Sequence, residues 1–378
     1  MKYVNLGSYK VKRREDSKSR LKLAALGIFV FILGYFIYLF WWPAFNVIKE
    51  VLKAPGSVIS LIRNPADTLE STNGRVNFLI LGIDKRSSIP YSYEGRDGKV
   101  YKNGFLSDTI LFASVDLETK DTFLLSLPRD LWVKIDQYGY GKINAAYSIG
   151  ETSGYAGGGL GLAKGVVEEH LGVPIHYSAR LDFQAFEKAI DAIDGVEINI
   201  DRAFDDYNYP IEGMENAECP DGSFNCHLQH VHFDQGVQKM DGETALRYVR
   251  SRQGTNGEGT DFARAKRQQK VILAFRDKAV SLETLANPIK LSSLILSFGE
   301  GLAMDFDLNV LGALVKLVKD VDPKKVRTVT LETGDTGLVY SPPMEQYGGA
   351  YVLLPKVGWD KIKLFLKENL SYEVGGSN

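Results

Sequence analysis

Residues 76–83 read VNFLILGI, a nearly continuous apolar run that ends at Asp84. Such a run is typical of a strand that is buried on both faces of a sheet. Two further strand-like runs, residues 109–115 and 122–127, flank the polar turn DLETKD and predict a hairpin. Further helices and a strand are expected at residues 161–171, 182–193, 196–200, 242–249 and 263–280. This alternation predicts an α/β fold, an α-β-α sandwich around a central, mixed sheet.

The C-terminal part of the chain resumes the same pattern. VRTVTL and AYVLLP read as strands, and WDKIKLFLKENL reads as an amphipathic helix. No obvious linker precedes these elements. We therefore expect them to close the same domain rather than to form a small appendix.

An uncharged run, LAALGIFVFILGYFIYLFWWPAF, occupies residues 23–45 and is long enough to cross a bilayer as one transmembrane helix. A cleaved signal peptide and a buried core helix are the alternatives, but the run is long, ends in bulky aromatic residues and is apolar all round. We favour an uncleaved anchor. By the positive-inside rule, the basic segment 1–22 stays in the cytoplasm, beside anionic membrane lipid, and the rest of the chain is extracytoplasmic.

The anchor divides the chain into five expected parts. Residues 1–22 are a basic cytoplasmic segment, 23–45 the transmembrane helix, 46–74 a stalk, 75–370 an extracytoplasmic domain and 371–378 a flexible tail. The chain has 378 residues, which suggests about two domains or one large one. Its apolar share of 44% and charged share of 24% are those of a globular protein.

Charge is unevenly distributed along the sequence. Eight Lys or Arg and two acidic residues precede Leu23, a net charge of +6, so the remaining chain carries −8 within a total of −2. This balance argues against a nucleic-acid partner. The net charge does not exclude a local phosphate-binding site, because phosphate binding depends on where the positive side chains lie and not on their sum over the chain.

Charged residues interrupt the apolar pattern where the predicted strands begin or end. Asp84 and Arg86 follow the first strand, Asp108 opens the second, and Arg129 and Asp130 follow the third. Side chains at such ends are placed to meet at one edge of an α/β sheet, where ligands usually bind.

A second group of charged residues lies in YVRSR and TDFARAKRQQ. Arg250 and Arg252 share a face only in an extended segment, so the preceding helix should end before Arg250 if both serve one site. Arg264 and Gln268 are four residues apart and share a helix face, whereas Arg267 points elsewhere. Asp261 follows a glycine-rich loop.

Arginines together with carboxylates fit a diphosphate ligand. Guanidinium groups bind phosphate oxygens in pairs, and Mg²⁺ uses one or two carboxylates plus phosphate oxygens and water. The competing interpretation is a set of exposed salt bridges on an ordinary surface.

Seven stretches in order resemble the LytR-CpsA-Psr family: NFLILGIDKR, SDTILFASVD, SLPRDLWVKI, KINAAYSIG, DGVEINIDRAFDD, MDGETALRYVRSR and DFARAKRQQ. The resemblance covers about residues 75–370. It implies a membrane-anchored α/β enzyme, a phosphotransferase that moves a glycopolymer from an undecaprenyl-pyrophosphate carrier to peptidoglycan or another cell-wall acceptor. The link formed is a phosphodiester.

The resemblance also implies roles for individual residues. Asp84 and Asp108 would ligate Mg²⁺, with Arg86 beside them, and Asp261 would be a metal partner or an acid/base group. The residues expected to grip the pyrophosphate are Arg86, Arg129, Lys142, Arg250, Arg252, Arg264 and Gln268. Leu106 is a departure, since many family members carry an arginine there.

The implied reaction is attack by an acceptor hydroxyl on the phosphorus that bears the glycopolymer, with polyprenyl monophosphate leaving. The prenyl tail would need an apolar tunnel, and the helix at residues 182–193 is one candidate wall, although core packing also accounts for it. A polyprenyl-pyrophosphate hydrolase and a non-catalytic, polymer-binding or regulatory protein are the alternatives.

Cys219 and Cys226 lie in CPDGSFNC and are the two cysteines of the chain. An oxidising compartment would permit a disulfide between them. Free thiols remain an alternative. A Cys/His metal site is another, because His227, His230 and His232 follow directly.

Overall fold

The computed structural model describes residues 65–83, 92–94, 100–102, 105–211, 214, 219–220, 225–285, 287, 290, 293–294 and 301–370. The chain divides into two compact units, Met1–Ala54 and Pro55–Asn378, and every described residue belongs to the second. The predicted transmembrane helix at residues 23–45 lies outside the described residues, as do Asp84 and Arg86. None of the helices within the described ranges combines the length and apolarity needed to span a bilayer.

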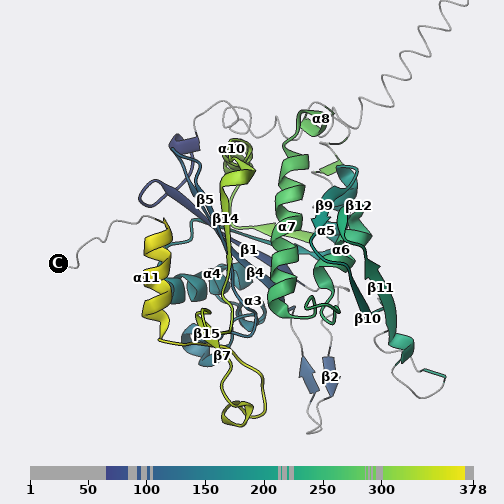
Figure 1. Cartoon of the computed structure of the whole chain (residues 1–378). Helices are drawn as coiled ribbons and strands as arrows, with labels where there is room; N and C mark the ends of the chain where they lie inside the picture. Colours follow the sequence, from purple (N-terminus) through teal and green to yellow (C-terminus); the bar gives the residue numbers. More distant parts are fainter. Residues whose placement is uncertain are drawn as a thin grey trace, which may run out of the picture. The chain divides into compact units, whose positions relative to one another are not determined.

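A six-stranded sheet forms the centre of the second unit, in the order β13-β8-β1-β4-β5-β14 (Figure 1). Its strands are β1 (Arg75–Ile83), β4 (Ser107–Asp116), β5 (Thr122–Ser126), β8 (Tyr177–Asp182), β13 (Leu302–Met304) and β14 (Val326–Thr330). The β1–β4, β4–β5 and β13–β8 pairs are antiparallel, and the β1–β8 and β5–β14 pairs are parallel. The predicted central mixed sheet is therefore confirmed.

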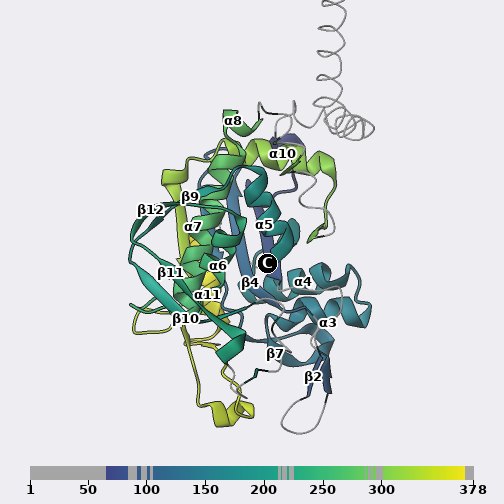
Figure 2. The same cartoon turned by 90° about the vertical axis from the view of Figure 1, so that its right-hand side faces the viewer.

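Helices pack on both faces of this sheet (Figures 1 and 2). They are α3 (Ala145–Ser153), α4 (Gly158–Leu171), α5 (Phe183–Ala192), α6 (Gly242–Arg250), α7 (Asp261–Ala279), α8 (Leu282–Leu285), α10 (Leu308–Lys319) and α11 (Trp359–Leu370). Alternate residues of β1 serve the two faces. Leu79 and Leu81 pack in the core cluster that includes residues of α3, α4 and α11, whereas Ile80 packs in the cluster with Ile272 of α7.

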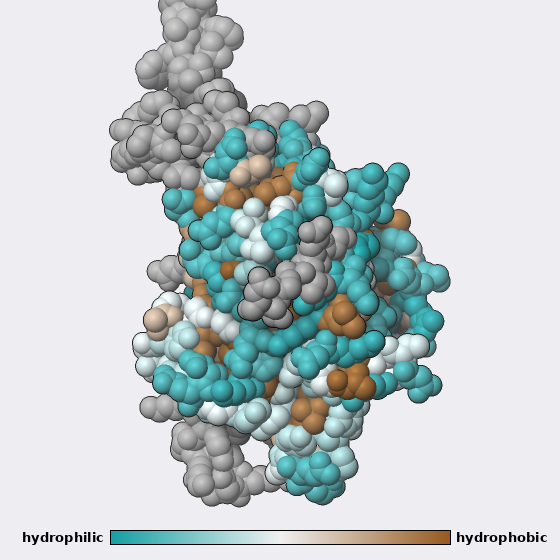
Figure 3. Space-filling model, turned by 90° about the vertical axis from the view of Figure 1, so that its left-hand side faces the viewer, coloured by the Kyte–Doolittle hydropathy of each residue, from teal (hydrophilic) through white to brown (hydrophobic). Residues whose placement is uncertain are grey.

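Helix α11 is amphipathic, with one apolar face toward the core and one largely polar face toward solvent. Its Ile362, Leu366 and Leu370 are buried in the core, while Leu364 is exposed. Figure 3 views the side of the domain on which α11 lies in Figure 1, and hydrophilic residues predominate over its described surface. The amphipathic pattern of this segment thus serves packing against the sheet.

Short strands and 3₁₀ turns complete the described chain. The strands are β2 (Ser92–Glu94), β3 (Val100–Lys102), β6 (Trp132–Lys134), β7 (Tyr140–Lys142), β9 (Val196–Ile200), β10 (Phe204–Pro210), β11 (Leu228–Phe233), β12 (Gly236–Met240), β15 (Val339–Tyr340) and β16 (Leu354–Pro355). The 3₁₀ turns are η1 (Pro65–Asp67), η2 (Asp136–Tyr138), η3 (Asn225–His227), η5 (Pro323–Lys325) and η6 (Met344–Tyr347). β10 and β11 form a two-stranded ribbon, and β12 pairs with β9.

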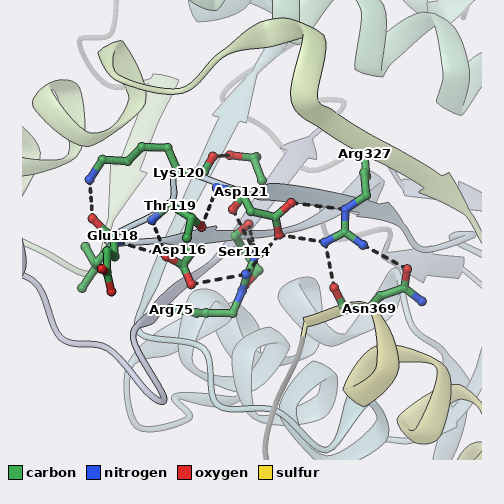
Figure 4. Close-up of polar contacts among 11 residues, drawn as sticks. Arg75, Ser114, Asp116, Glu118, Thr119, Lys120, Asp121, Arg327 and Asn369 are labelled. Carbon is green, nitrogen blue, oxygen red and sulfur yellow. Dashed lines mark hydrogen bonds and ion pairs between the residues drawn. The ribbon is translucent and has the colours of Figure 1, made fainter.

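Polar contacts fix the C-terminal elements to the sheet. Arg327 of β14 donates from Nη2 to Asp121 Oδ2 at 2.7 Å and to the Asn369 carbonyl of α11 at 2.7 Å (Figure 4). Asp121 also accepts from Arg75 Nη1 at 3.1 Å, and Arg75 Nε donates to Ser114 at 2.9 Å. Since β14 also pairs with β5, the C-terminal segment closes the same domain, as expected.

Candidate active site

Three strand ends meet at one edge of the sheet. Ile83, the last residue of β1, pairs with Ser107, the first residue of β4, after a register shift at Gly82. A Cβ on Gly82 would lie 2.9 Å from the Cβ of Thr109, so the close approach of the strands requires glycine there. β5 ends at the same edge, and Arg129 follows three residues later.

Arg129 and Asp108 form the central ion pair of this edge. Arg129 Nη1 donates to Asp108 Oδ1 at 2.7 Å. Arg129 Nε lies 3.5 Å from Asp130 Oδ2 and 3.8 Å from Asp261 Oδ2, but it is buried and has no hydrogen-bond partner among the described residues. Buried donors are nearly always satisfied, so this atom is available to an anionic ligand.

Asp261 links three arginines at the start of α7. Its Oδ1 lies 2.9 Å from Arg264 Nη1 and 3.7 Å from Arg252 Nε, while Oδ2 faces Arg129. Helix α7 begins here because Thr260 caps it, its hydroxyl accepting from the Ala263 amide at 3.0 Å. The cap fixes Asp261 at the first helical position, where a carboxylate also interacts favourably with the helix dipole.

In this cluster, the opposite charges of neighbouring side chains offset the cost of burying Asp108 and Arg129 in their charged forms. Burial would raise the pKa of Asp108, but Arg129, Arg264 and Arg252 lower it below its ordinary value. Burial lowers the pKa of Arg264 to about 10, and Arg129 and Arg252 contribute in the same direction. Burial would also lower the pKa of Arg129, yet Asp108, Asp261 and Asp130 raise it. Asp108 is therefore ionised at neutral pH and Arg129 is protonated.

A cavity of about 560 Å³ opens beside this cluster. Asp108, Arg252 and Arg264 line its charged part. Its apolar wall comes from the sheet and from α5, α6 and α7, and consists of Ile80, Leu81, Leu181, Phe183, Phe186, Leu246, Val249 and Ile272. The helix expected as one wall of an apolar tunnel, α5, does line this cavity.

Arg250 lies at the boundary between the charged and apolar parts of the cavity. Its guanidinium carbon lies 4.5 Å from the ring centroid of Phe183 and 5.6 Å from that of Tyr209. Helix α6 ends at Arg250 and not before it, so that expectation was wrong. The chain becomes extended at Ser251, whose φ is −52° and ψ 131°. Arg250, at the end of the helix, and Arg252, after it, both line the cavity.

Asp206 of β10 holds the segment that carries Arg252, and its role was not anticipated from the sequence. Its Oδ2 accepts from the Ser251 hydroxyl at 2.7 Å and from the amides of Arg252 and Gln253 at 3.1 Å each. Burial raises its pKa, but these hydrogen bonds lower it overall. The one available signal was the acidic pair in FDDYN, within a segment that lacks regular alternation.

Arg267 points away from the cavity, as predicted. It donates to the carbonyl of Tyr248 at 2.9 Å, to the carbonyl of Ser251, and to Glu258 Oε2 at 2.6 Å. Arg267 therefore supports the backbone around Arg250 and Arg252. Gln268 lines the cavity, and its side chain donates to the Val249 carbonyl at 3.4 Å.

The remaining predicted residues lie at different distances from the cluster. Lys142 Nζ contacts Asp130 Oδ1 at 2.5 Å and so reaches the cluster through that carboxylate. The predicted site residues that the structure brings together are Asp108, Arg129, Lys142, Arg250, Arg252, Asp261, Arg264 and Gln268. Asp84 and Arg86 are outside the described residues, so their positions relative to Asp108 stay predictions.

Cys219 and Cys226 form a disulfide, with a Cα–Cα distance of 5.7 Å. The sulfurs are therefore bonded to each other, which removes the free thiols and the thiolate ligands that a Cys/His metal site would need. The bond closes a short loop before β11.

The fold and this edge of the sheet define a class: an α/β domain with a cluster of arginines and carboxylates beside an apolar cavity. The chain belongs to the LytR_cpsA_psr family, whose model matches residues 54–353. The resemblance noted from the sequence is confirmed.

Relatives of known name support this membership. The chain is 28% identical over 312 residues to the polyisoprenyl-teichoic acid–peptidoglycan teichoic acid transferase TagU of Oceanobacillus iheyensis, covering 81% of this chain and 84% of TagU. It is 27% identical over 266 residues to the Bacillus subtilis transferase of the same description, TagT, covering 70% and 68%. The crystal structure of B. subtilis TagV shares the fold, with a TM-score of 0.56 at 23% identity over 80% of this chain and 100% of TagV.

Proposed function

We propose that this protein is a membrane-anchored phosphotransferase that moves a glycopolymer from an undecaprenyl-pyrophosphate carrier to peptidoglycan through a phosphodiester link. The observation that carries the proposal is the buried Nε of Arg129, which lies beside Asp108 and Asp261 and lacks a hydrogen-bond partner within the described part of the chain. A phosphate oxygen would satisfy it. Relatives named polyisoprenyl-teichoic acid–peptidoglycan teichoic acid transferases support the reaction class.

The arginines of the site suit a pyrophosphate. Its cationic members are Arg129, Lys142, Arg250, Arg252 and Arg264, and its carboxylates are Asp108, Asp130, Asp182, Asp206 and Asp261. Several of the guanidinium groups can each offer two donors to phosphate oxygens. A pyrophosphate, which carries several such oxygens, would therefore match the donors of the site.

The cavity beside the arginines suits a lipid tail. Its charged end holds Arg252 and Arg264, and its apolar wall includes Phe183 and Phe186. A polyprenyl pyrophosphate has the same division, a charged head next to a long hydrocarbon chain. Burial of the chain against this wall would contribute about 25 cal/mol per Å² of apolar surface removed from water.

Mg²⁺ is the proposed cofactor, and the chemistry of the donor set fits it. Asp108 gives one oxygen to Arg129, and a carboxylate has further lone pairs for a metal. Mg²⁺ needs only one or two carboxylates together with phosphate oxygens and water. Asp108 would hold it, with Asp84 as the second ligand that the sequence predicts, and bound Mg²⁺ would offset phosphate charge.

The reaction forms one bond and breaks one bond at the same phosphorus. An acceptor hydroxyl attacks the phosphorus that bears the glycopolymer, and the bridging oxygen leaves on polyprenyl monophosphate. Arg129, Arg252 and Arg264 stabilise the negative charge on the phosphoryl oxygens. Asp261 lies beside all three and would accept the proton of the hydroxyl, because Asp108 is paired with Arg129 and would also hold the metal.

The anchor at residues 23–45 would place this chemistry at the outer face of the membrane, where the lipid-linked donor and the wall acceptor meet. The pyrophosphate bond supplies the driving force. No nucleotide is needed outside the cell.

Incubation of the purified full chain with a polyprenyl-pyrophosphate glycan, Mg²⁺ and an acceptor glycan tests the proposal. Joined glycan supports transfer. Free phosphorylated glycan alone supports the hydrolase alternative, and unchanged donor despite binding contradicts both enzymatic proposals.

A matched pair of variants sharpens this test. Arg252→Ala should abolish joining and weaken donor binding, because Arg252 lines the cavity and contacts Asp261. Arg247→Ala is the control, since Arg247 lies on α6, just before the segment that carries Arg252, and pairs with Glu243. Full activity of Arg252→Ala would remove the arginine cluster from the mechanism.

A further inference from the structure

Two histidines and an aspartate converge on the ribbon formed by β10 and β11. His232 of β11 lies opposite Asp205 of β10 in the strand pairing. His230 is two residues earlier on β11, so its side chain leaves the same face of the strand. The three side chains are thereby brought together by backbone pairing, on strands of the described part of the chain.

The ligand atoms of these side chains point at one another. His230 Nε2 lies 2.7 Å and His232 Nδ1 2.8 Å from the same oxygen, Asp205 Oδ1. One ligand atom from each residue falls within 4.8 Å of the other two. Zinc lies about 2.0–2.2 Å from its nitrogen and carboxylate-oxygen ligands, so the ligand atoms of one site must lie within a few ångströms of one another, as these do.

Neighbouring side chains hold both imidazole rings. The second nitrogen of His232, Nε2, lies 3.1 Å from Asp234 Oδ1. The ring of Tyr207 stacks on that of His230, with centroids 4.5 Å apart and an interplanar angle of 9°. A carboxylate on the far nitrogen of a metal-binding histidine is the usual supporting contact, because it fixes the ring and the tautomer.

We propose that Asp205, His230 and His232 bind a Zn²⁺ ion, with Asp234 as the carboxylate that orients His232. Two imidazoles and one carboxylate are a donor set that zinc takes, and a fourth position is open to water. The side chains of His230 and His232 are 49% and 45% exposed, so solvent reaches the site.

The zinc site is distinct from the arginine cluster but is connected to it through backbone. Asp205 and Thr255 are joined by two hydrogen bonds, from the Asp205 amide to Thr255 Oγ1 at 3.0 Å and from the Thr255 amide to the Asp205 carbonyl at 2.8 Å. The next residue, Asp206, holds the amide of Arg252. A zinc ion would therefore brace the ribbon at the point where it supports the Arg252 segment.

Zinc titration of the purified full chain tests this inference, with the free metal measured by a chromophoric chelator. The wild type should bind one equivalent that His232→Ala and His230→Ala lose. Asp234→Asn should keep the site but bind about 10–100-fold more weakly. His227→Gln is the control, because His227 lies next to the disulfide and outside the cluster, and it should bind like the wild type.

Cobalt substitution gives a second, spectroscopic readout. Co²⁺ bound at the site should show visible absorption bands that disappear in His232→Ala and persist in His227→Gln. The inference is overturned if the wild type binds no zinc above buffer level, if His232→Ala keeps the full equivalent, or if His227→Gln loses it. Circular dichroism of each variant confirms that the fold is retained.

Discussion

Arg129 donates from one nitrogen, Nη1, to Asp108 at 2.7 Å, and its Nε is buried without a hydrogen-bond partner in the ranges that the structure describes. The residue therefore has a structural contact and an unused donor at the same time. An ion pair that served stability alone would leave no buried donor unsatisfied, because such a donor costs about 1–3 kcal/mol. We interpret the unused donor as the place of a phosphate oxygen.

Arg129→Lys tests this interpretation. Lysine keeps the positive charge next to Asp108 but has no Nε–H and no planar fork, so we expect kcat/KM for transfer to fall at least about tenfold. Steady-state transfer assays measure the loss. Arg247→Lys, on an exposed face, should leave the rate unchanged. Equal rates for Arg129→Lys and the wild type would show that charge alone suffices.

Arg264→Lys should make transfer depend on pH. The surroundings of Arg264 lower its pKa to about 10, first through burial and then through Arg129 and Arg252. Lysine begins from an ordinary pKa about two units or more below that of arginine, so the same surroundings make it lose its proton at a lower pH. The ratio of variant to wild-type activity should fall as the pH rises from about 6 to 9. A constant ratio over that range would contradict the proposed role.

Asp206→Asn should destabilise the protein and misplace Arg252. The folded-state pKa of Asp206 is lowered, so its stabilising contribution is present above the unfolded pKa of about 3.9 and is lost as the pH falls through the folded pKa. We expect about 1–3 kcal/mol of lost stability at neutral pH. Denaturant unfolding of both proteins should show the difference shrinking below about pH 4. A difference independent of pH would argue against an ionised Asp206.

Phe186→Ala should weaken binding of the lipid tail of the donor. Phe186 lines the apolar part of the cavity, away from the ion pairs. The loss of its ring should raise the KM for a long-chain polyprenyl donor by roughly tenfold, from the transfer energy of a partly buried aromatic side chain. A short-chain donor assayed on the same variant is the internal control and should change little. Equal effects on both donors would place the tail elsewhere.

The apolar runs of the sequence predicted the centre of the fold well. β1, β4 and β5 are long stretches of buried residues, and their hydrophobic pattern outweighs local alternatives. Helices α5, α6 and α7 were also expected. Helix α6 was expected to end before Arg250, but it continues through Arg250, and the backbone becomes extended at Ser251. Strands β8 and β13, helices α3 and α10, and the β10–β11 ribbon were not predicted.

The physical reason for these omissions is that tertiary contacts form those elements. β10 reads FDDYNYP, which lacks regular alternation, and its pairing with β11 shifts register between Asp206 and Tyr209. AYVLLP yields only the two-residue strand β16 for a similar reason, since the rest of it docks on Asp130 and Trp132 through isolated backbone contacts.

The candidate site was predictable by residue type and less so by geometry. Asp108, Arg129, Arg252, Asp261 and Arg264 stood out as charges at element ends, and they meet in the structure. Their meeting depends on strand register and on the start of α7, which no local pattern fixes. The contacts of Asp206 and the cluster on the ribbon depend on residues paired across strands, so the linear sequence could not display them.

Transfer with a donor labelled separately at each phosphorus tests the central claim most directly. The full chain, Mg²⁺ and an acceptor glycan are incubated with a polyprenyl-pyrophosphate glycan that carries ³²P either next to the sugar or next to the lipid. We predict that the sugar-side label appears in the joined acceptor and the lipid-side label in polyprenyl monophosphate, and that Arg252→Ala yields neither. Sugar-side label released only as free glycan phosphate, or both labels retained on the lipid, would contradict the account.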